Sequence, residues 1–307
     1  MNHRRSFGLA VVFGFGLGLA GSAFAQDAPE VGPRPAQPFK NMESHIGNLT
    51  GHSKDAKTDY RRYCAGCHGE LGDANGENAQ WLDPKPRNFT LATFKCRSTP
   101  TGTLPTDEDL YNSIGRGFTN SNMPIWNTLS KQQRADLVAF IKTFSPRWDK
   151  EKAGDVIKVP SEPPVTIQSI SHGKYLFTKL ECWKCHGPQG KGDGPSAATL
   201  TDSQDNPIRP YNFSAGADDS RFKCGAANQD IYKIFMAGVD GTPMPSFADV
   251  IQPNDAWDLV HFLRTLQVKR HGPENSALKA AGGTIPAYVE KTDPQTPPAA
   301  EKPSGNE

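Results

Sequence analysis

Two copies of one five-residue motif limit what this chain can be. Residues 64–68 read Cys-Ala-Gly-Cys-His and residues 182–186 read Cys-Trp-Lys-Cys-His, in a chain of 307 residues. Two cysteines separated by two residues and followed by a histidine form the attachment site of a c-type haem. The cysteines form thioethers with the porphyrin vinyl groups, and the histidine is then held where it ligates the iron. The predicted attachment residues are Cys64, Cys67, His68, Cys182, Cys185 and His186.

We therefore predict two covalently attached haem c groups, one in each half of the chain. A lone pair of cysteines with this spacing also occurs in thioredoxin-type redox sites and in zinc sites. Here both copies end in histidine and occupy matching places in a repeat, which favours haem attachment over these alternatives.

The N-terminus has the pattern of an export signal. Arg4 and Arg5 precede an apolar run over residues 7–20, and residues 23–25 read Ala-Phe-Ala. We predict a Sec signal peptide over residues 1–25 and a location in the periplasm, where apocytochrome cysteines meet haem. An uncleaved membrane anchor is the alternative, although the Gly-rich run is on the short side for a membrane span. The mature protein is expected to be soluble or peripherally membrane-associated.

Composition agrees with an exported globular protein of two domains. The chain is 36% hydrophobic and 22% charged, as is typical of soluble domains. Its formal net charge is +1, and removal of residues 1–25 takes away Arg4 and Arg5 and leaves −1. This near-neutral balance gives no indication of a nucleic-acid partner.

The first half is predicted to contain a leader and one helical domain. Residues 26–50 are rich in proline and read as an extended leader, so the first domain is placed at residues 51–148. Helices are expected over residues 54–63 and 107–114. A third begins at Ser130, which forms a capping-box pattern with the glutamine three residues later.

The second half repeats this order after a linker at residues 149–168. Its domain is placed at residues 169–270, and a tail with six prolines and no periodicity is predicted to be disordered over residues 271–307. The helices expected in the second domain cover residues 171–180, 230–236 and 254–266.

The two halves match beyond the cysteine motifs, which indicates an internal duplication. The further matches are Pro-Arg-Asn-Phe (86–89) with Pro-Tyr-Asn-Phe (210–213), Phe-Lys-Cys (94–96) with Phe-Lys-Cys (222–224), and Met-Pro (123–124) with Met-Pro (244–245). Met123 lies 55 residues after His68, and Met244 lies 58 residues after His186. A methionine can simply fill a core, but this recurrence in register favours a sixth iron ligand in each half.

In this order of elements the sequence resembles the class I cytochrome c family, twice over. In that family a helix precedes the haem motif, a loop rich in glycine and proline follows, and a Met-Pro before the last helix provides the distal sulfur. The resemblance covers residues 51–148 and 169–270. It implies an all-α fold of two tandem class I cytochrome c domains, each about three to four helices around one covalently bound haem c. It also implies that Met123 and Met244 are the distal ligands.

The other candidate iron ligands do not recur. Met236 lies on a helical stretch and corresponds to Gly115, so we expect it to pack rather than to ligate. Four histidines have no counterpart in the other half and are expected to be surface or structural residues. They are His45, His52, His172 and His261.

Cys96 and Cys224 are the cysteines that haem attachment leaves over. They occupy equivalent places in the two halves, and the periplasm favours disulfides. A disulfide between them would clamp the two domains together. The alternatives are two buried thiols that act as small hydrophobes, or a cysteine ligand to iron.

The tandem arrangement resembles dihaem cytochromes of the c4 kind and cytochrome c subunits of respiratory redox complexes. With histidine and methionine on each iron, no open position is left for a substrate. We therefore predict an electron carrier that passes electrons between redox protein partners, such as a dehydrogenase or a membrane respiratory complex, with no catalytic residues and no small-molecule substrate. The alternative is a dihaem oxidoreductase such as a peroxidase or a thiosulfate dehydrogenase. Dihaem enzymes of the latter kind use a cysteine as distal ligand, which would give Cys96 that role.

Overall fold

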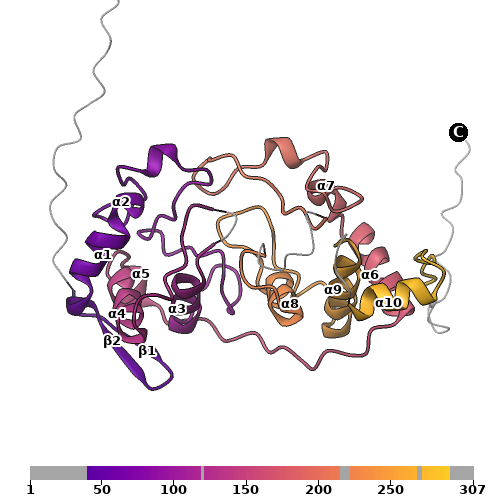
Figure 1. Cartoon of the computed structure of the whole chain (residues 1–307), viewed down its shortest axis with the longest axis horizontal. Coiled ribbons are helices and arrows are strands. Elements are labelled where there is room, and N and C mark those ends of the chain that lie inside the picture. Colours follow the sequence, from indigo (N-terminus) through magenta and orange to yellow (C-terminus); the bar gives the residue numbers. More distant parts are fainter. Residues whose placement is uncertain (1–39, 119–120, 215–221, 268–271, 291–307) are drawn as a thin grey trace, which may run out of the picture. The chain divides into compact units, whose positions relative to one another are not determined.

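The computed structural model describes residues 40–118, 121–214, 222–267 and 272–290 (Figure 1). The predicted signal peptide, the first part of the leader and the last part of the tail lie outside these residues. The first half contains the strands β1 (Glu43–Ile46) and β2 (Leu49–His52) and the helices α1 (Lys57–Tyr63), α2 (Ala65–His68), α3 (Asp107–Arg116), α4 (Lys131–Lys142) and α5 (Arg147–Lys150). The second half contains α6 (Ile167–Lys179), α7 (Trp183–His186), α8 (Asn228–Ala237), α9 (Pro253–Thr265) and α10 (Pro273–Ala280).

The helices begin where side chains can satisfy the free backbone N–H groups of a first turn. At the start of α4, Ser130 Oγ accepts from Gln133 N at 3.1 Å, and Gln133 Oε1 accepts from Ser130 N at 3.0 Å. Thr106 and Asp109 form the same box before α3, with distances of 3.1 and 3.0 Å. The capping box predicted at Ser130 is therefore confirmed.

Buried apolar side chains form two separate clusters, one in each half. The first includes Tyr60 of α1, Leu110 of α3 and Phe140 of α4. The second includes Leu176 of α6 and Trp257 of α9, which is fully buried. Each half thus has its own hydrophobic core, built from a helix before the cysteine motif, a middle helix and a closing helix.

The all-α prediction needs one correction in the first half. β1 and β2 form an antiparallel hairpin in which Glu43 faces His52 and Ile46 faces Leu49. Ser44 Oγ donates to Ala135 O at 2.7 Å, so the hairpin lies against α4. The leader predicted to extend to residue 50 is wrong for the strands, because Ile46 belongs to the first core.

In the second half a long helix takes the place of the hairpin. α6 packs directly against α9, and Gly173 makes the close approach possible. A Cβ atom at this position would lie 1.9 Å from Asp258 O. The α6–α9 crossing therefore brings backbone against backbone, which only glycine permits here.

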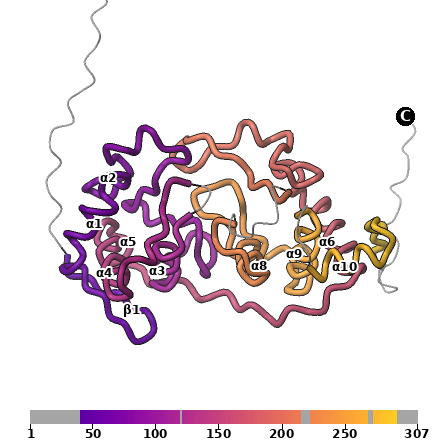
Figure 2. Tube along the Cα trace, viewed as in Figure 1, coloured from indigo at the N-terminus to yellow at the C-terminus, as the bar shows by residue number. Residues whose placement is uncertain are grey.

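The linker contacts the first half, and part of the tail is more ordered than predicted. Figure 2 shows the chain running as an extended segment between the two halves, and Ile157 N donates to Ser98 O at 2.8 Å. Beyond residue 270, α10 forms and Ser171 Oγ donates to Pro286 O at 2.8 Å. The prediction of a disordered tail is therefore wrong for residues 272–290. Among the described helices, none has the length and apolar character needed to cross a membrane.

Candidate haem-binding sites

Both cysteine motifs lie on short helices that follow a core helix. Cys64 separates α1 from α2, and α7 follows Cys182 in the same way. Gly69 and Gly187 end the two motifs with φ angles of 81° and 77°, a left-handed region that glycine enters without steric cost. The four motif cysteines are half-buried and none of them is in a disulfide.

The first cysteine of each motif, Cys64 or Cys182, is held as a thiol rather than as a reactive thiolate. Burial is the main cause that raises the pKa of Cys64 to about 12, with the Asp59 carboxylate adding to it. Burial likewise raises the pKa of Cys182 to about 11. Thioredoxin-type cysteines have lowered pKa values and zinc ligands are thiolates. This environment favours the haem interpretation over those two.

Each motif histidine is held by one backbone carbonyl. His68 Nδ1 lies 2.9 Å from Arg87 O, and His186 Nδ1 lies 3.0 Å from Tyr211 O. A carbonyl only accepts, so Nδ1 carries the proton and donates it. Burial lowers the pKa of both histidines, which keeps the rings neutral. Nε2 of each ring is then left with a lone pair for a metal ion.

An aromatic ring covers each histidine from the same loop. Phe89 packs 4.4 Å from the His68 ring, and Phe89 N donates to Gly72 O at 2.7 Å. Phe213 packs 4.8 Å from His186, and Phe213 N donates to Gly190 O at 2.7 Å. The matching Pro-x-Asn-Phe segments thus place a phenylalanine ring against the motif histidine in the same way in both halves.

The two methionines lie on loops of one geometry. Phe118 N donates to Met123 O at 3.0 Å, and Val239 N donates to Met244 O at 3.1 Å. The loop returns to the middle helix through Trp126 N to Ile114 O, 3.3 Å, in the first half. In the second half Phe247 N donates to Phe235 O at 2.8 Å.

A glycine at the end of each middle helix admits the methionine loop. A Cβ on Gly117 would lie 2.4 Å from Pro124 O, and one on Gly238 would lie 2.7 Å from Ser246 N. Both glycines have positive φ angles, 62° and 71°. Each glycine stands six residues before its methionine in the sequence, a recurrence from which this close approach could have been predicted.

The rival ligands lie elsewhere. Met236 is buried in the second core on α8. His172 Nδ1 is 2.8 Å from Asp258 Oδ2, and His261 Nδ1 is 2.8 Å from Ser169 Oγ. His45 and His52 lie beside Glu43. Methionine ligation by Met123 and Met244 stays a prediction that these placements favour.

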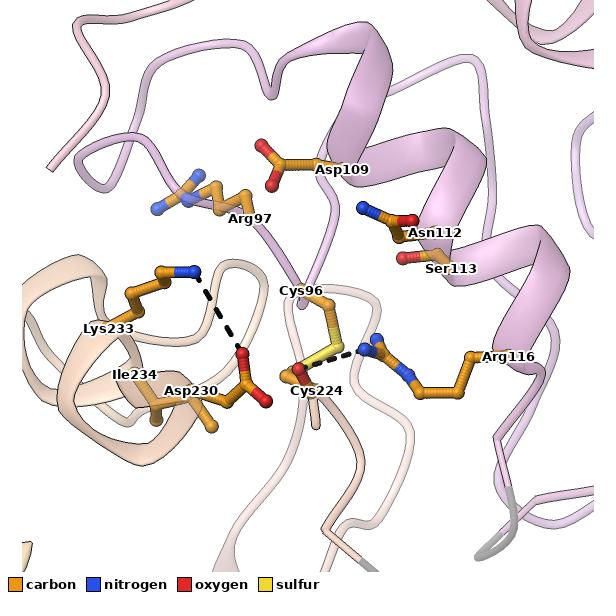
Figure 3. Close-up of a pocket in the computed structure, with 10 residues that line it drawn as sticks. All are labelled: Cys96, Arg97, Asp109, Asn112, Ser113, Arg116, Cys224, Asp230, Lys233 and Ile234. Atoms are coloured by element: carbon orange, nitrogen blue, oxygen red, sulfur yellow. Dashed lines mark hydrogen bonds and ion pairs between the residues drawn. A yellow bond between two sulfur atoms is a disulfide. The ribbon is translucent and has the colours of Figure 1, made fainter. Parts of the chain in front are cut away.

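Cys96 and Cys224 form a disulfide that joins the two halves (Figure 3). Their Cα atoms are 5.0 Å apart across 128 residues of sequence. Next to the bridge, the buried Arg97 donates to Asp240 Oδ2 and, at 3.3 Å, to Ala237 O. A small cavity of about 90 Å³ lies beside the disulfide, where Arg116 donates to Cys224 O at 3.0 Å. Sequence reasoning did not identify the Arg97–Asp240 pair, since nothing in the repeat relates these two positions.

The residues present fit a haem c in each half. Two thiols, a neutral histidine with Nε2 free of the backbone hydrogen bond, and a half-buried methionine are the donor set that this group requires. The same set, held by equivalent hydrogen bonds, occurs in both halves.

Comparison with known proteins relates each half to a cytochrome family. The family model described as "Cytochrome c" matches residues 170–267, and the one described as "Cytochrome C oxidase, cbb3-type, subunit III" matches residues 53–141. A solved structure described as the Kuenenia stuttgartiensis reducing HAO-like protein complex Kustc0457/Kustc0458 contains a chain that is 42% identical. The match covers 70% of this chain and 96% of that one, with a TM-score of 0.67. A search of curated protein sequences found no match.

Proposed function

The chain belongs to the cytochrome c family, and on that premise we propose that it is a periplasmic dihaem electron carrier. In this proposal His68 and Met123 ligate one iron, and His186 and Met244 ligate the other. The observation that carries it is the duplicated site, because the same histidine-to-carbonyl bond and the same methionine loop occur in both halves.

Bound haem supplies a one-electron iron couple. The chain's own residues keep the ligand geometry constant while the charge on the iron changes. The carbonyls of Arg87 and Tyr211 orient the two imidazoles. The hydrogen bonds from Phe118 N to Met123 O and from Val239 N to Met244 O hold the two methionines. Fixed ligands require little rearrangement on electron transfer. In the first half the exposed apolar side chains of Trp81 and Ile125 offer contact area to a partner.

We propose carrier behaviour rather than turnover of a small molecule. A thiosulfate dehydrogenase mechanism would need a cysteine as iron ligand, and the sulfur of Cys96 is bonded to Cys224. The partner is proposed to be a redox protein, which is supported by the related chain belonging to a two-protein complex. The predicted signal peptide over residues 1–25 supports the periplasmic location.

Haem counting and redox titration test this function. The proposal predicts two haems per chain by pyridine haemochrome analysis and by intact mass, both linked to peptides that contain the two motifs. Potentiometric titration should give two reversible one-electron steps. Purified protein should not oxidise thiosulfate or consume hydrogen peroxide at enzyme-like rates. Rapid turnover of either compound would support the enzyme alternative instead.

A further inference from the structure

Three basic side chains lie on the loops that hold the two haem histidines. Arg87 supplies the carbonyl that binds His68 Nδ1. Lys95 and Lys223 are the matched lysines of the two Phe-Lys-Cys segments, one from each half. All three are half-buried rather than exposed. We call Arg87, Lys95 and Lys223 the basic cluster.

The disulfide and one glycine bring the basic cluster together from both halves. Lys95 and Lys223 directly precede Cys96 and Cys224, whose Cα atoms are 5.0 Å apart. Arg87 of the first half reaches the second, since its Nη1 lies 3.0 Å from where a Cβ of Gly241 would be. Ser203 Oγ lies 3.2 Å from the same point. A larger residue at Gly241 would push the guanidinium away.

The cluster has an excess of positive charge. Its members repel one another, and among the described residues Asp202 is the carboxylate that opposes Arg87 and Lys95. Burial is the main cause that lowers the pKa of Lys95, to about 8, and that of Lys223. Within the described residues, none of these side chains has a hydrogen bond or an ion pair. Neighbouring Arg97, in contrast, donates to Asp240 Oδ2 and to Ala237 O.

Half-buried like charges repel one another, and a bound anion between them would offset that repulsion. We propose that the basic cluster binds carboxylates of the haem groups, the propionates, from both halves of the molecule. This inference rests on the proposed dihaem function. Each haem carries two propionates, and lysine and arginine form strong charge-assisted hydrogen bonds with carboxylates. The cluster then links the two haems electrostatically as well as mechanically.

Reduction potentials test the proposal in the loaded protein. A nearby positive charge stabilises an added electron, so its removal disfavours the ferrous state. The double variant Lys95→Gln, Lys223→Gln is expected to lower the reduction equilibrium constant of both haems about tenfold, which is about 59 mV for one electron. The charge-conserving double variant Lys95→Arg, Lys223→Arg should stay within about twofold of the wild type. Lys191→Gln, which removes an exposed lysine near the second haem motif, is the matched control.

Potentials of the glutamine variant equal to those of Lys191→Gln would overturn the proposal while leaving the electron-carrier function intact. Loss of reversible haem reduction in the wild type would instead contradict the proposed function itself. An anion from solution could bind the basic cluster in place of the propionates. If the wild-type potentials shift by a similar factor when phosphate replaces a neutral buffer at constant ionic strength, the cluster binds solution anions and the proposal fails. If the double variant does not retain haem, Lys95→Gln and Lys223→Gln carry the test singly, each with an expected threefold effect, and no effect in either overturns it.

Discussion

The two halves hold their haem motifs in the same way and build the surrounding frame differently. In both, a carbonyl binds the histidine Nδ1 and a glycine admits the methionine loop. The first half, however, packs a β-hairpin and the short α1 against its closing helix, whereas the second packs the long α6 against α9. The difference teaches that the haem site constrains the loops, while the element that covers the closing helix can be exchanged.

Removal of the disulfide is expected to reduce stability the most, because the bridge makes the two halves unfold together. The double variant Cys96→Ser, Cys224→Ser opens a loop of 128 residues and should lose about 5 kcal/mol of stability in the chain-entropy model. Each half has its own core, so we expect the single unfolding transition of the oxidised protein to separate into two.

Calorimetry on the oxidised wild type, the reduced wild type and the variant checks this result. Reduced wild type should match the variant, which controls for effects of the serines. One unchanged transition in all three samples would mean that the bridge does not couple the halves.

Removal of the Arg97–Asp240 ion pair is expected to cause the second-largest loss of stability. Asp240→Ala leaves Arg97 buried without its carboxylate, which should cost about 3 kcal/mol. Asp240 also accepts from Thr101 Oγ1 at 2.8 Å, so the loop of the first half should loosen. Denaturant unfolding measures the loss, with Asp249→Ala at an exposed site as control. A cost no larger than that of the control would show that the pair contributes nothing to the interface.

Gly173→Ala tests the frame of the second half directly. The added Cβ would meet Asp258 O, so α6 must move away from α9 at a cost of about 2–3 kcal/mol. Gly51→Ala should act likewise in the first half, where the Cβ would lie 2.2 Å from Ala135 O. Hydrogen exchange should locate each loss in its own half. Lys174→Ala, an exposed neighbour on α6, should be neutral; equal losses in both halves for either glycine variant would contradict the separate frames.

The sequence predicted the repeated parts of this molecule and missed the parts that differ. Short motifs or the repeat itself reveal these parts in the sequence: the haem motifs, the capping box at Ser130, and the matched positions of Cys96 and Cys224. The β1–β2 hairpin is short, and it is held by contacts with residues far away in sequence, such as the hydrogen bond from Ser44 Oγ to Ala135 O. Ordering of residues 272–290 likewise depends on contacts with α6. Long-range contacts of this kind leave no periodic signal in the sequence.

The smallest predicted effect is on the pH dependence of stability, through Asp258 on α9 of the second half. Burial is the main cause that raises the pKa of Asp258, and its bond with His172 offsets this only in part. The folded carboxyl therefore holds its proton more tightly than the unfolded one. Its contribution is present below the unfolded pKa of about 3.8 and is lost as pH rises through the raised folded value.

Asp258→Asn should remove that decline, a difference of about 1 kcal/mol or less between pH 4 and pH 7. Denaturant titrations of both proteins across this range measure it, and Asp249→Asn serves as the exposed control. If the free energy of unfolding of the wild type rose relative to that of the variant between pH 4 and pH 7, the raised pKa would be contradicted.

We propose that the two halves hold equivalent His/Met iron sites although different elements pack against their closing helices. The ferric absorbance spectrum tests this proposal most directly. Methionine ligation gives a long-wavelength sulfur-to-iron band. Met123→Leu and Met244→Leu should each remove about half of this band, the double variant should remove all of it, and Met236→Leu should leave it unchanged. A wild-type spectrum without the band, or a band that persists in the Met123→Leu, Met244→Leu protein, would contradict the ligand assignment.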